Sequence, residues 1–157
     1  MPQVRANRIV HIVALLLAVW SGITAAAQPA AGSRGSMASG DEAVLAAREA
    51  LGKGDRARLA TAAAAIGEHP LKSYGEFWSL QLRLRSERGA ESAALDKAVV
   101  DFLERHPRTY VADRIRLEWL LSLGARRDFG AFLRERPALV WDDDPQLRCY
   151  ELLSRYM

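Results

Sequence analysis

Cysteine is almost absent from this sequence, and its scarcity excludes several kinds of protein. Cys149 is the only cysteine among 157 residues. One cysteine cannot form an internal disulfide or a paired-cysteine metal site. No cysteine lies near the N-terminus, so the chain lacks the lipid attachment point of bacterial lipoproteins. Cys149 falls on an expected late helix without a nearby histidine, and we expect a small buried residue rather than a catalytic thiol.

The sequence also lacks a large excess of charge of one sign and a long apolar run. The formal net charge is +3 and both signs are interspersed, so no basic patch predicts nucleic-acid binding. The apolar run at residues 12–20 has nine members, fewer than the roughly 20 that span a bilayer. Neither a nucleic-acid partner nor a membrane partner is therefore expected for the mature chain.

The same apolar run belongs to a predicted signal peptide. Arg5 and Arg8 precede it, and Ala25 and Ala27 follow at the positions that signal peptidase reads. A membrane anchor is the alternative, which the shortness of the run disfavours. We expect a signal peptide over residues 1–27, cleavage after Ala27 and an exported protein. Cleavage removes two arginines and lowers the formal net charge from +3 to +1.

The remainder of the chain predicts a short linker and an all-α domain. Residues 28–40 are small, polar and glycine-rich, which is typical of a flexible linker. From Asp41 onward apolar residues recur at helical spacing without sustained alternation, so a helical domain is expected over residues 41–157. Ser39 and Glu42 match a capping box for its first helix.

Capping residues, glycines and prolines divide this domain into helices. The expected N-caps are Asp55, Thr109, Asp128 or a neighbour of it, and Asp144. The expected helix-ending residues are Gly52, Gly54, Pro70, Gly89, Pro107, Gly124 and Pro137. The helix between Thr109 and Gly124 carries two adjacent apolar stripes, formed by Val111, Ile115, Trp119 and Leu123 and by Leu117, Leu120 and Leu121. It should therefore pack against more than one neighbour.

Three of the prolines mark a repeat. Pro70, Pro107 and Pro137 are 37 and then 30 residues apart. An apolar residue stands four positions before each (Ile66, Leu103, Leu133) and another eight before (Ala62, Val99, Phe129). An aromatic that can pack under the turn stands three or four positions after each (Tyr74, Tyr110, Trp141). This recurrence predicts an α-solenoid of TPR-like helical hairpins. The alternative is a globular bundle of seven helices.

Residues with chemical potential have structural explanations in this sequence. His69 and His106 stand at equivalent repeat positions near helix ends, where the helix dipole favours histidine, and Arg136 takes that position in the third repeat. Asp142-Asp143-Asp144 lacks the alternating ligands of a calcium loop and suits a turn with a helix cap. Trp78, Trp119 and Trp141 would stack on sugar rings if exposed, but their spacing favours a core. No phosphate-binding, hydrolase or metalloprotease motif is present.

Three segments resemble the N-terminal helical region of soluble lytic murein transglycosylases, the periplasmic enzymes of Gram-negative bacteria. They are HPLKSYGEFW, FLERHPRTYVADRIRLEWL and the V-W-D-D-D-x-x-L-x-C-Y run from Val140 to Tyr150. With the residues between them they cover essentially all of the helical domain. The resemblance implies helical hairpins of a U-domain-like superhelix that continues into a ring, ahead of a lysozyme-like catalytic domain. It also implies a periplasmic location, with peptidoglycan glycan strands and the remainder of the ring as partners.

The catalytic part of that family is missing. Those enzymes cleave the bond between N-acetylmuramic acid and N-acetylglucosamine with one glutamate in an E-S motif. Glu91-Ser92 is not that pair, because Ala93-Ala94-Leu95 follows it and the G-L-M-Q and A-Y-N-A-G companions are absent. We therefore predict no catalytic, cofactor-binding or metal-ligating residue, and no cofactor.

The expected function is a non-catalytic scaffold of a periplasmic lytic transglycosylase, acting in glycan-strand cleavage and cell-wall turnover. A stand-alone periplasmic helical-repeat interaction module and a complete small enzyme are the alternatives. The last residues stay in helical register without a polar terminal repeat. That pattern predicts a truncated reading frame and self-association through the last helix.

Overall fold

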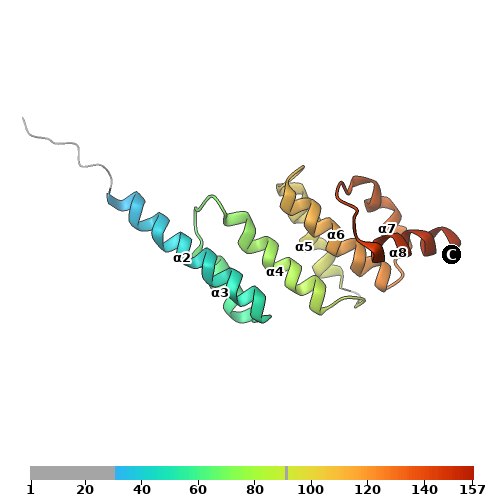
Figure 1. Ribbon diagram of the computed structural model, residues 1–157, viewed down its shortest axis with the longest axis horizontal. Coiled ribbons are helices and arrows are strands. Elements are labelled where there is room, and N and C mark those ends of the chain that lie inside the picture. The colour runs from blue at the N-terminus through green and yellow to red at the C-terminus, as the bar shows by residue number, and fades with distance from the viewer. Residues whose placement is uncertain (1–30, 91) are drawn as a thin grey trace, which may run out of the picture. The chain divides into compact units, whose positions relative to one another are not determined.

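The computed structural model describes residues 31–90 and 92–157, and every regular element in that part of the chain is helical. The elements are α2 (Ala31–Lys53), α3 (Arg56–Ala65), α4 (Lys72–Ser86), α5 (Ala93–Arg105), α6 (Tyr110–Ala125), α7 (Phe129–Glu135), the 3-10 helix η1 (Arg136–Ala138) and α8 (Pro145–Tyr156). The predicted all-α class is confirmed for these residues (Figure 1). The chain divides into two units, Met1–Ser33 and Arg34–Met157, and the helices α3 to α8 belong to the second.

The first described helix begins earlier than the sequence predicted. Helix α2 starts at Ala31, so residues 31–40 are helical rather than a flexible linker, and Ser39 and Glu42 lie inside the helix instead of forming a capping box. Alanine, serine and methionine tolerate helix well, and this tolerance outweighs the glycines. Gly40 also lies against the His69 ring, where a β-carbon would be 3.0 Å from Cδ2. The predicted signal peptide and residues 28–30 lie outside the described residues.

The four predicted N-caps are confirmed. Each cap accepts a hydrogen bond through a side-chain oxygen from a backbone amide two or three residues later, at a distance of 2.8–3.3 Å. The capping residues are Asp55, Thr109, Asp128 and Asp144. Ser92 caps α5 in the same way at 3.3 Å. These bonds satisfy amides that have no partner inside the helix, so they fix where each helix starts. No helix in the described part of the chain is long and apolar enough to cross a membrane.

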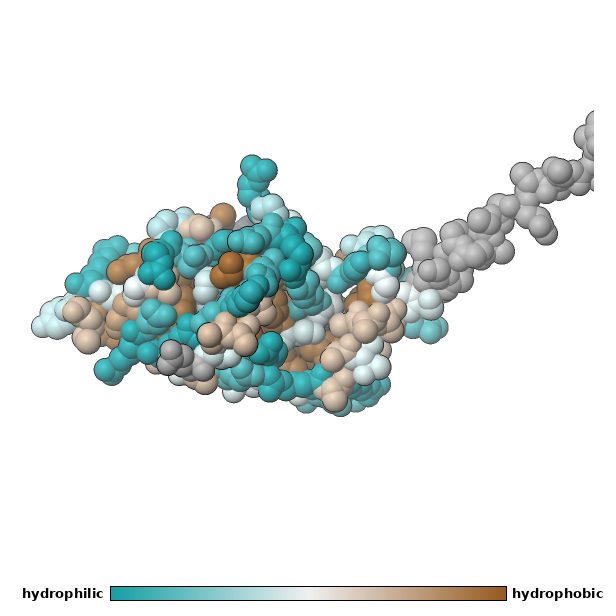
Figure 2. Space-filling model, turned by 180° about the vertical axis from the view of Figure 1, so that it is seen from behind, coloured by the Kyte–Doolittle hydropathy of each residue, from teal (hydrophilic) through white to brown (hydrophobic). Residues whose placement is uncertain are grey.

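The buried side chains form two clusters that meet on α4. The smaller cluster joins α2 to α3 and consists of Ala43, Val44, Ala47, Ala50, Leu59, Ala62 and Ile66. The larger one extends from α4 to α8 and includes the fully buried Phe102, Ile115, Leu120, Phe132 and Leu147. Trp78 packs against both clusters. On the face that Figure 2 shows, hydrophilic residues cover most of the surface, with small hydrophobic areas between them.

Helix α6 lies at the centre of the larger cluster. It contacts α4, α5, α7 and α8, and from Val111 to Gly124 every residue is buried except Arg114 and Arg116. Both predicted apolar stripes are therefore buried, because this helix has neighbours on several sides. Helices that are two apart along the chain are in contact, since α4 contacts α6 and α6 contacts α8. Consecutive helices are in contact as well, since α5 contacts α4 and α6, and α7 contacts α6 and α8.

Polar side chains within this core are paired across helices. Glu118 of α6 is 4 % exposed. It accepts hydrogen bonds from the Arg85 Nε at 2.8 Å and the Arg88 Nη2 at 2.9 Å. Asp96 of α5 accepts from the Trp119 indole at 2.7 Å and from Arg126 at 2.6 Å. These pairs satisfy the buried Glu118 carboxylate and the partly buried Asp96 carboxylate, which would otherwise destabilise the core.

Two expectations about buried positions were wrong. Cys149 is exposed, because α8 buries Leu147 and Ser154 on one face and Cys149 lies on the other. Leu133 is also exposed, and its neighbour Phe132 fills the core instead. Pro137 does end a helix as predicted, because α7 stops at Glu135, two residues before it, and the proline itself lies in η1.

The aromatic residues after the repeat prolines also differ from the prediction. Tyr74 is half-buried and packs edge-on against Phe77 and Trp78. Tyr110 and Trp141 are exposed and do not pack under their turns. Tyr110 is the first residue of α6, and Trp141 lies in the loop after η1, so both side chains lie at the edge of the core.

Gly124 has a packing role rather than the predicted helix-ending role. Helix α6 continues through it to Ala125, and a β-carbon at this position would lie only 2.9 Å from the Tyr150 Cβ of α8 and closer still to its ring. We expect Gly124→Ala to lower the free energy of unfolding by about 1–3 kcal/mol, because α8 must move away from α6. Urea denaturation measures this change.

The matched control is Gly130→Ala in α7. Its nearest neighbour is the Arg134 guanidinium at 3.6 Å, so an added methyl group meets ordinary contact distance. Alanine favours helix over glycine by up to about 1 kcal/mol, and the control should be neutral or stabilising. Equal destabilisation of the two variants would contradict the close packing of α6 and α8.

Candidate binding pocket on helix α6

The two histidines of the repeat bind separate partners. The His69 Nε2 lies 2.9 Å from Asp41 Oδ1, and its Nδ1 accepts a hydrogen bond from the Leu71 amide at 3.0 Å. His106 packs on the Phe102 ring at 4.6 Å. Each side chain therefore joins a helix end to a neighbouring group.

The aspartates of the Asp142–Asp144 run also have structural positions. Asp142 pairs with Arg136 at 2.8 Å, and Asp144 caps α8. No group of three or more metal-ligating side chains that could hold an ion occurs among residues 31–90 and 92–157. Glu91 of the E-S pair lies outside the described residues, and Ser92 is the N-cap of α5.

The three candidate tryptophans lie in different surroundings. Trp119 is buried and bonded to Asp96, whereas Trp78 is half-buried against Tyr74. Trp141 is 62 % exposed. Only Trp141 of these three therefore presents a largely open ring to a ligand.

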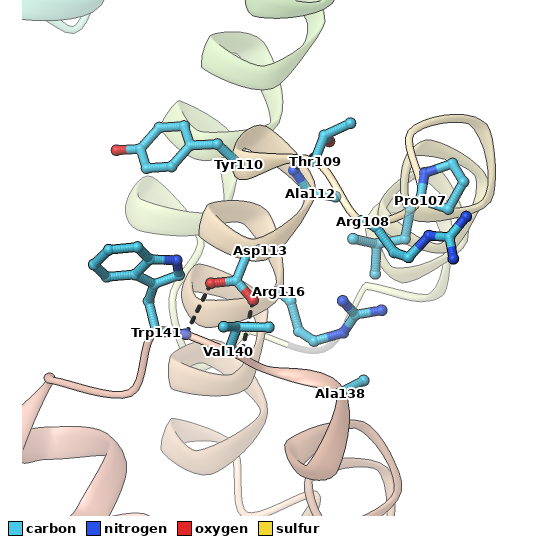
Figure 3. A pocket seen from close by; sticks show the side chains of 11 residues that line it. Pro107, Arg108, Thr109, Tyr110, Ala112, Asp113, Arg116, Ala138, Val140 and Trp141 are labelled. Carbon is cyan, nitrogen blue, oxygen red and sulfur yellow. Dashed lines mark hydrogen bonds between the residues drawn. The ribbon is translucent and has the colours of Figure 1, made fainter.

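Trp141 lines a pocket of about 540 Å³ over the first two turns of α6. The turn between α5 and α6 forms one wall, and the loop between η1 and α8 forms the other (Figure 3). Its apolar lining includes Leu103, Ala112, Ala138 and Val140. Tyr110 and Trp141 lie on one side of Asp113 in Figure 3, and the guanidinium groups of Arg108 and Arg116 lie on the other. The pocket thus combines aromatic rings, apolar surface and positive charge.

Asp113 holds the second wall in place. Its carboxylate is buried, at 7 % exposure of the residue, and each oxygen accepts one backbone hydrogen bond from the loop. Oδ1 accepts from the Val140 amide at 2.8 Å, and Oδ2 accepts from the Trp141 amide at 3.0 Å. Bonds to a charged acceptor are stronger than neutral ones. The position of the Trp141 ring at the pocket therefore depends on an aspartate from a different helix.

The two arginines differ in their surroundings. The Arg116 Nε is buried without a hydrogen-bond partner, and the nearest acid is Glu135 at 3.6 Å. Arg108 is exposed, makes no ion pair within the described residues, and has a left-handed backbone with φ of 58°. Such a backbone is uncommon outside glycine. Arg116 thus already faces a carboxylate, whereas Arg108 lies at the surface.

This chemistry suits recognition rather than catalysis. Both oxygens of Asp113 are occupied by amides, so neither is placed to accept or give a proton to a substrate. The remaining polar groups of the pocket are guanidinium, hydroxyl and indole groups, which donate hydrogen bonds and stack. The arrangement can hold a ligand but has no nucleophile with an adjacent base.

Sequence reasoning did not find this pocket. Tyr110 and Trp141 were predicted to pack under turns, and Trp141 was also named as a residue that would stack on sugar rings if exposed. No sequence pattern pointed to Asp113, Arg108 or Arg116. One signal is that α6 carries the charged residues Asp113, Arg114, Arg116 and Glu118 among its apolar ones. Such an interruption of the apolar pattern usually marks a buried polar group with a partner, but it does not identify that partner.

Asp113→Asn should loosen the loop. An asparagine side chain turns its amide hydrogens toward one of the two backbone donors, so at least one hydrogen bond is lost. We expect the free energy of unfolding to fall by about 1–3 kcal/mol, measured by urea denaturation, with increased amide exchange at Trp141. Asp143→Asn in the same loop is the control, because that exposed side chain has no hydrogen bond or ion pair with any other described residue. A similar loss in both variants would contradict the anchoring role.

The comparisons with known proteins give no family for this chain. A scan against protein-family models, a search of curated proteins and a search of solved structures each find no match. The function is therefore inferred from the sequence pattern and from the geometry described above.

Proposed function

We propose that this chain is a non-catalytic scaffold built from stacked two-helix repeats. The observation that carries this proposal is the order of helix contacts. Helices α4, α6 and α8 touch in succession, and α5 and α7 each contact the helices before and after them. That order is typical of an α-solenoid, in which each hairpin packs on the next. In this arrangement α4–α5 and α6–α7 are successive hairpins.

The more specific proposal is the scaffold portion of a periplasmic lytic transglycosylase, exported by the signal peptide at residues 1–27. Its support is that the segments resembling that family coincide with the junctions between hairpins. One spans the turn into α4, one runs from the end of α5 through α6, and one forms the loop and α8. The scaffold would contribute to glycan-strand cleavage in peptidoglycan turnover by shaping the path of the strand.

The buried acids support a role without chemistry of its own. A transglycosylase of this kind needs a carboxyl group that can protonate a leaving oxygen in an enclosed cleft. Asp113 is held by two amides, and Glu118 by Gln81, Arg85 and Arg88. Neither acid faces an open cleft with an unoccupied oxygen.

A stand-alone interaction module is the second candidate. The observation that favours it is the pocket on α6, which presents Tyr110 and Trp141 at the surface of an isolated chain. The DNA downstream of the coding sequence separates the two candidates. Further hairpins followed by E-S and A-Y-N-A-G motifs support the transglycosylase scaffold, whereas an unrelated gene supports the module.

The purified chain should release no anhydro-muropeptides from murein sacculi, because its two described buried acids, Asp113 and Glu118, are both held by hydrogen bonds from other groups. Chromatography of the soluble products measures this release. A complete lytic transglycosylase on the same sacculi is the positive control. Release by this chain above the buffer background would overturn the non-catalytic assignment.

The chain should also self-associate through α8. Leu152, Tyr156 and Met157 are 67 %, 91 % and 74 % exposed, and α8 lies next to α6 as α6 lies next to α4. Burial of such apolar area drives association. We expect sedimentation to detect dimers that Leu152→Glu converts to monomers. Leu45→Glu on α2, where the residue is 66 % exposed, is the matched control and should leave the dimer intact. A monomeric wild-type chain at high concentration contradicts this interface.

A further inference from the structure

We propose that the aromatic side of the pocket on α6 binds a proline-rich peptide segment in the extended polyproline II conformation. The aromatic side is formed by Tyr110 and Trp141, which both lie on one side of Asp113 in Figure 3. The proposal holds for the scaffold and for the interaction module alike. It goes beyond both by assigning a class of protein partner to a named surface.

The first observation is the exposure of two aromatic rings at one edge of the core. Tyr110 is 60 % exposed and Trp141 is 62 % exposed, and Val140 beside Trp141 is 76 % exposed. The two aromatic residues line one pocket, although Tyr110 begins α6 and Trp141 lies in the loop before α8. Exposed apolar groups that gather at one place mark interaction sites, whereas singly scattered ones do not. Aromatic-lined grooves are the surfaces on which proline-rich segments dock.

The second observation is the balance of hydrogen-bonding groups in the pocket. The Tyr110 hydroxyl and the Trp141 indole N–H make no hydrogen bond to any other described residue. Asp113 is the only carboxylate in the pocket, and each of its oxygens already accepts a backbone amide. The Thr109 hydroxyl is also occupied, since it donates to the His106 carbonyl and caps α6. The side chains of the aromatic side thus offer free donors, and their acceptors are largely occupied.

A proline-rich segment matches this balance. Proline has no backbone N–H, and a polyproline II helix has no internal hydrogen bonds, so its carbonyl groups are free to accept. Tyr110 and Trp141 can donate to those carbonyls while their rings pack against the pyrrolidine rings. An ordinary extended peptide brings amide donors, and a sugar brings hydroxyl donors. A donor buried without an acceptor costs free energy, so both fit this surface less well.

The loop that carries Trp141 is held in place before a ligand arrives. Asp113 accepts from the Val140 amide at 2.8 Å and from the Trp141 amide at 3.0 Å. Tyr110 is the first residue of α6, directly after the N-cap Thr109. The backbone of both aromatic residues is therefore ordered, and a polyproline II segment is already extended when free. Binding orders few additional groups, which lowers its entropy cost.

The test is a titration of the chain with a proline decamer whose ends are blocked, followed by the Trp141 indole signal in nitrogen–proton NMR spectra. A blocked decamer of alternating serine and glycine is the comparison peptide, because it has the same length but is flexible and carries amide donors. We expect saturable binding of the proline decamer, at least about tenfold tighter than binding of the serine–glycine decamer.

Two substitutions separate the contributions of the rings and the donors. Trp141→Ala should weaken binding of the proline decamer at least about tenfold, because aromatic anchors dominate the affinity of such interfaces. Tyr110→Phe keeps the ring and removes the hydroxyl donor, so it should weaken binding about two- to tenfold. Both positions are exposed, so the variants should keep the wild-type circular dichroism spectrum.

Tyr156→Ala is the matched control for Trp141→Ala. Tyr156 is 91 % exposed at the end of α8 and does not line the pocket. Its removal should leave the affinity for the proline decamer unchanged. Equal weakening by Trp141→Ala and Tyr156→Ala would show that any exposed aromatic ring suffices, and would overturn the site.

Three other results would also overturn the proposal. They are no saturable binding by the folded chain, equal affinity for the two decamers, and tighter binding of an N-acetylglucosamine trimer than of the proline decamer. None of these results bears on the scaffold proposal, which fails if the chain releases anhydro-muropeptides. The two failures are therefore distinguishable.

Discussion

The enclosure of helix α6 is the constraint on which the rest of the structure depends. Four other helices contact it, and nearly every residue from Val111 to Gly124 is buried. An enclosed helix can carry polar side chains only where a neighbour supplies a partner. Glu118 accepts a hydrogen bond from Arg85 of α4, and the Trp119 indole donates a hydrogen bond to Asp96 of α5. These bonds restrict how the surrounding helices can be placed.

The same constraint builds the pocket. Asp113 lies on the α6 face toward the loop before α8, and its burial is tolerated because two loop amides bind it. The loop is consequently fixed over the first turns of α6, with Trp141 at its outer edge. A packing requirement inside the fold thereby determines the position of an exposed aromatic ring. This link between core and surface is the physical basis of the proposed recognition site.

Local features of the fold were predictable from the sequence, and long-range ones were not. An N-cap such as Thr109 depends only on residues within one helical turn, and the apolar stripes of α6 indicate directly which faces are buried. Both features were therefore predicted correctly. Gly124 was taken for a helix end because its close neighbour, Tyr150, lies on a different helix. The bond from Val140 to Asp113 spans 27 residues, and no local pattern encodes it. The pocket depends on such pairs, so the sequence alone did not predict it.

The division of the interior between two clusters has a consequence for how the chain opens. The α2–α3 cluster is built largely from alanines, including Ala43, Ala47 and Ala50, whereas the cluster around α6 contains phenylalanines, leucines and a tryptophan. Small side chains remove less apolar area from water, so the first pair of helices has less stabilisation per residue. Parts of a fold with lower stability open more often, and their backbone amides then exchange with solvent. Native-state hydrogen exchange should therefore be faster in α2 and α3 than in α6. The N-terminal pair can fray and re-form while the pocket stays intact.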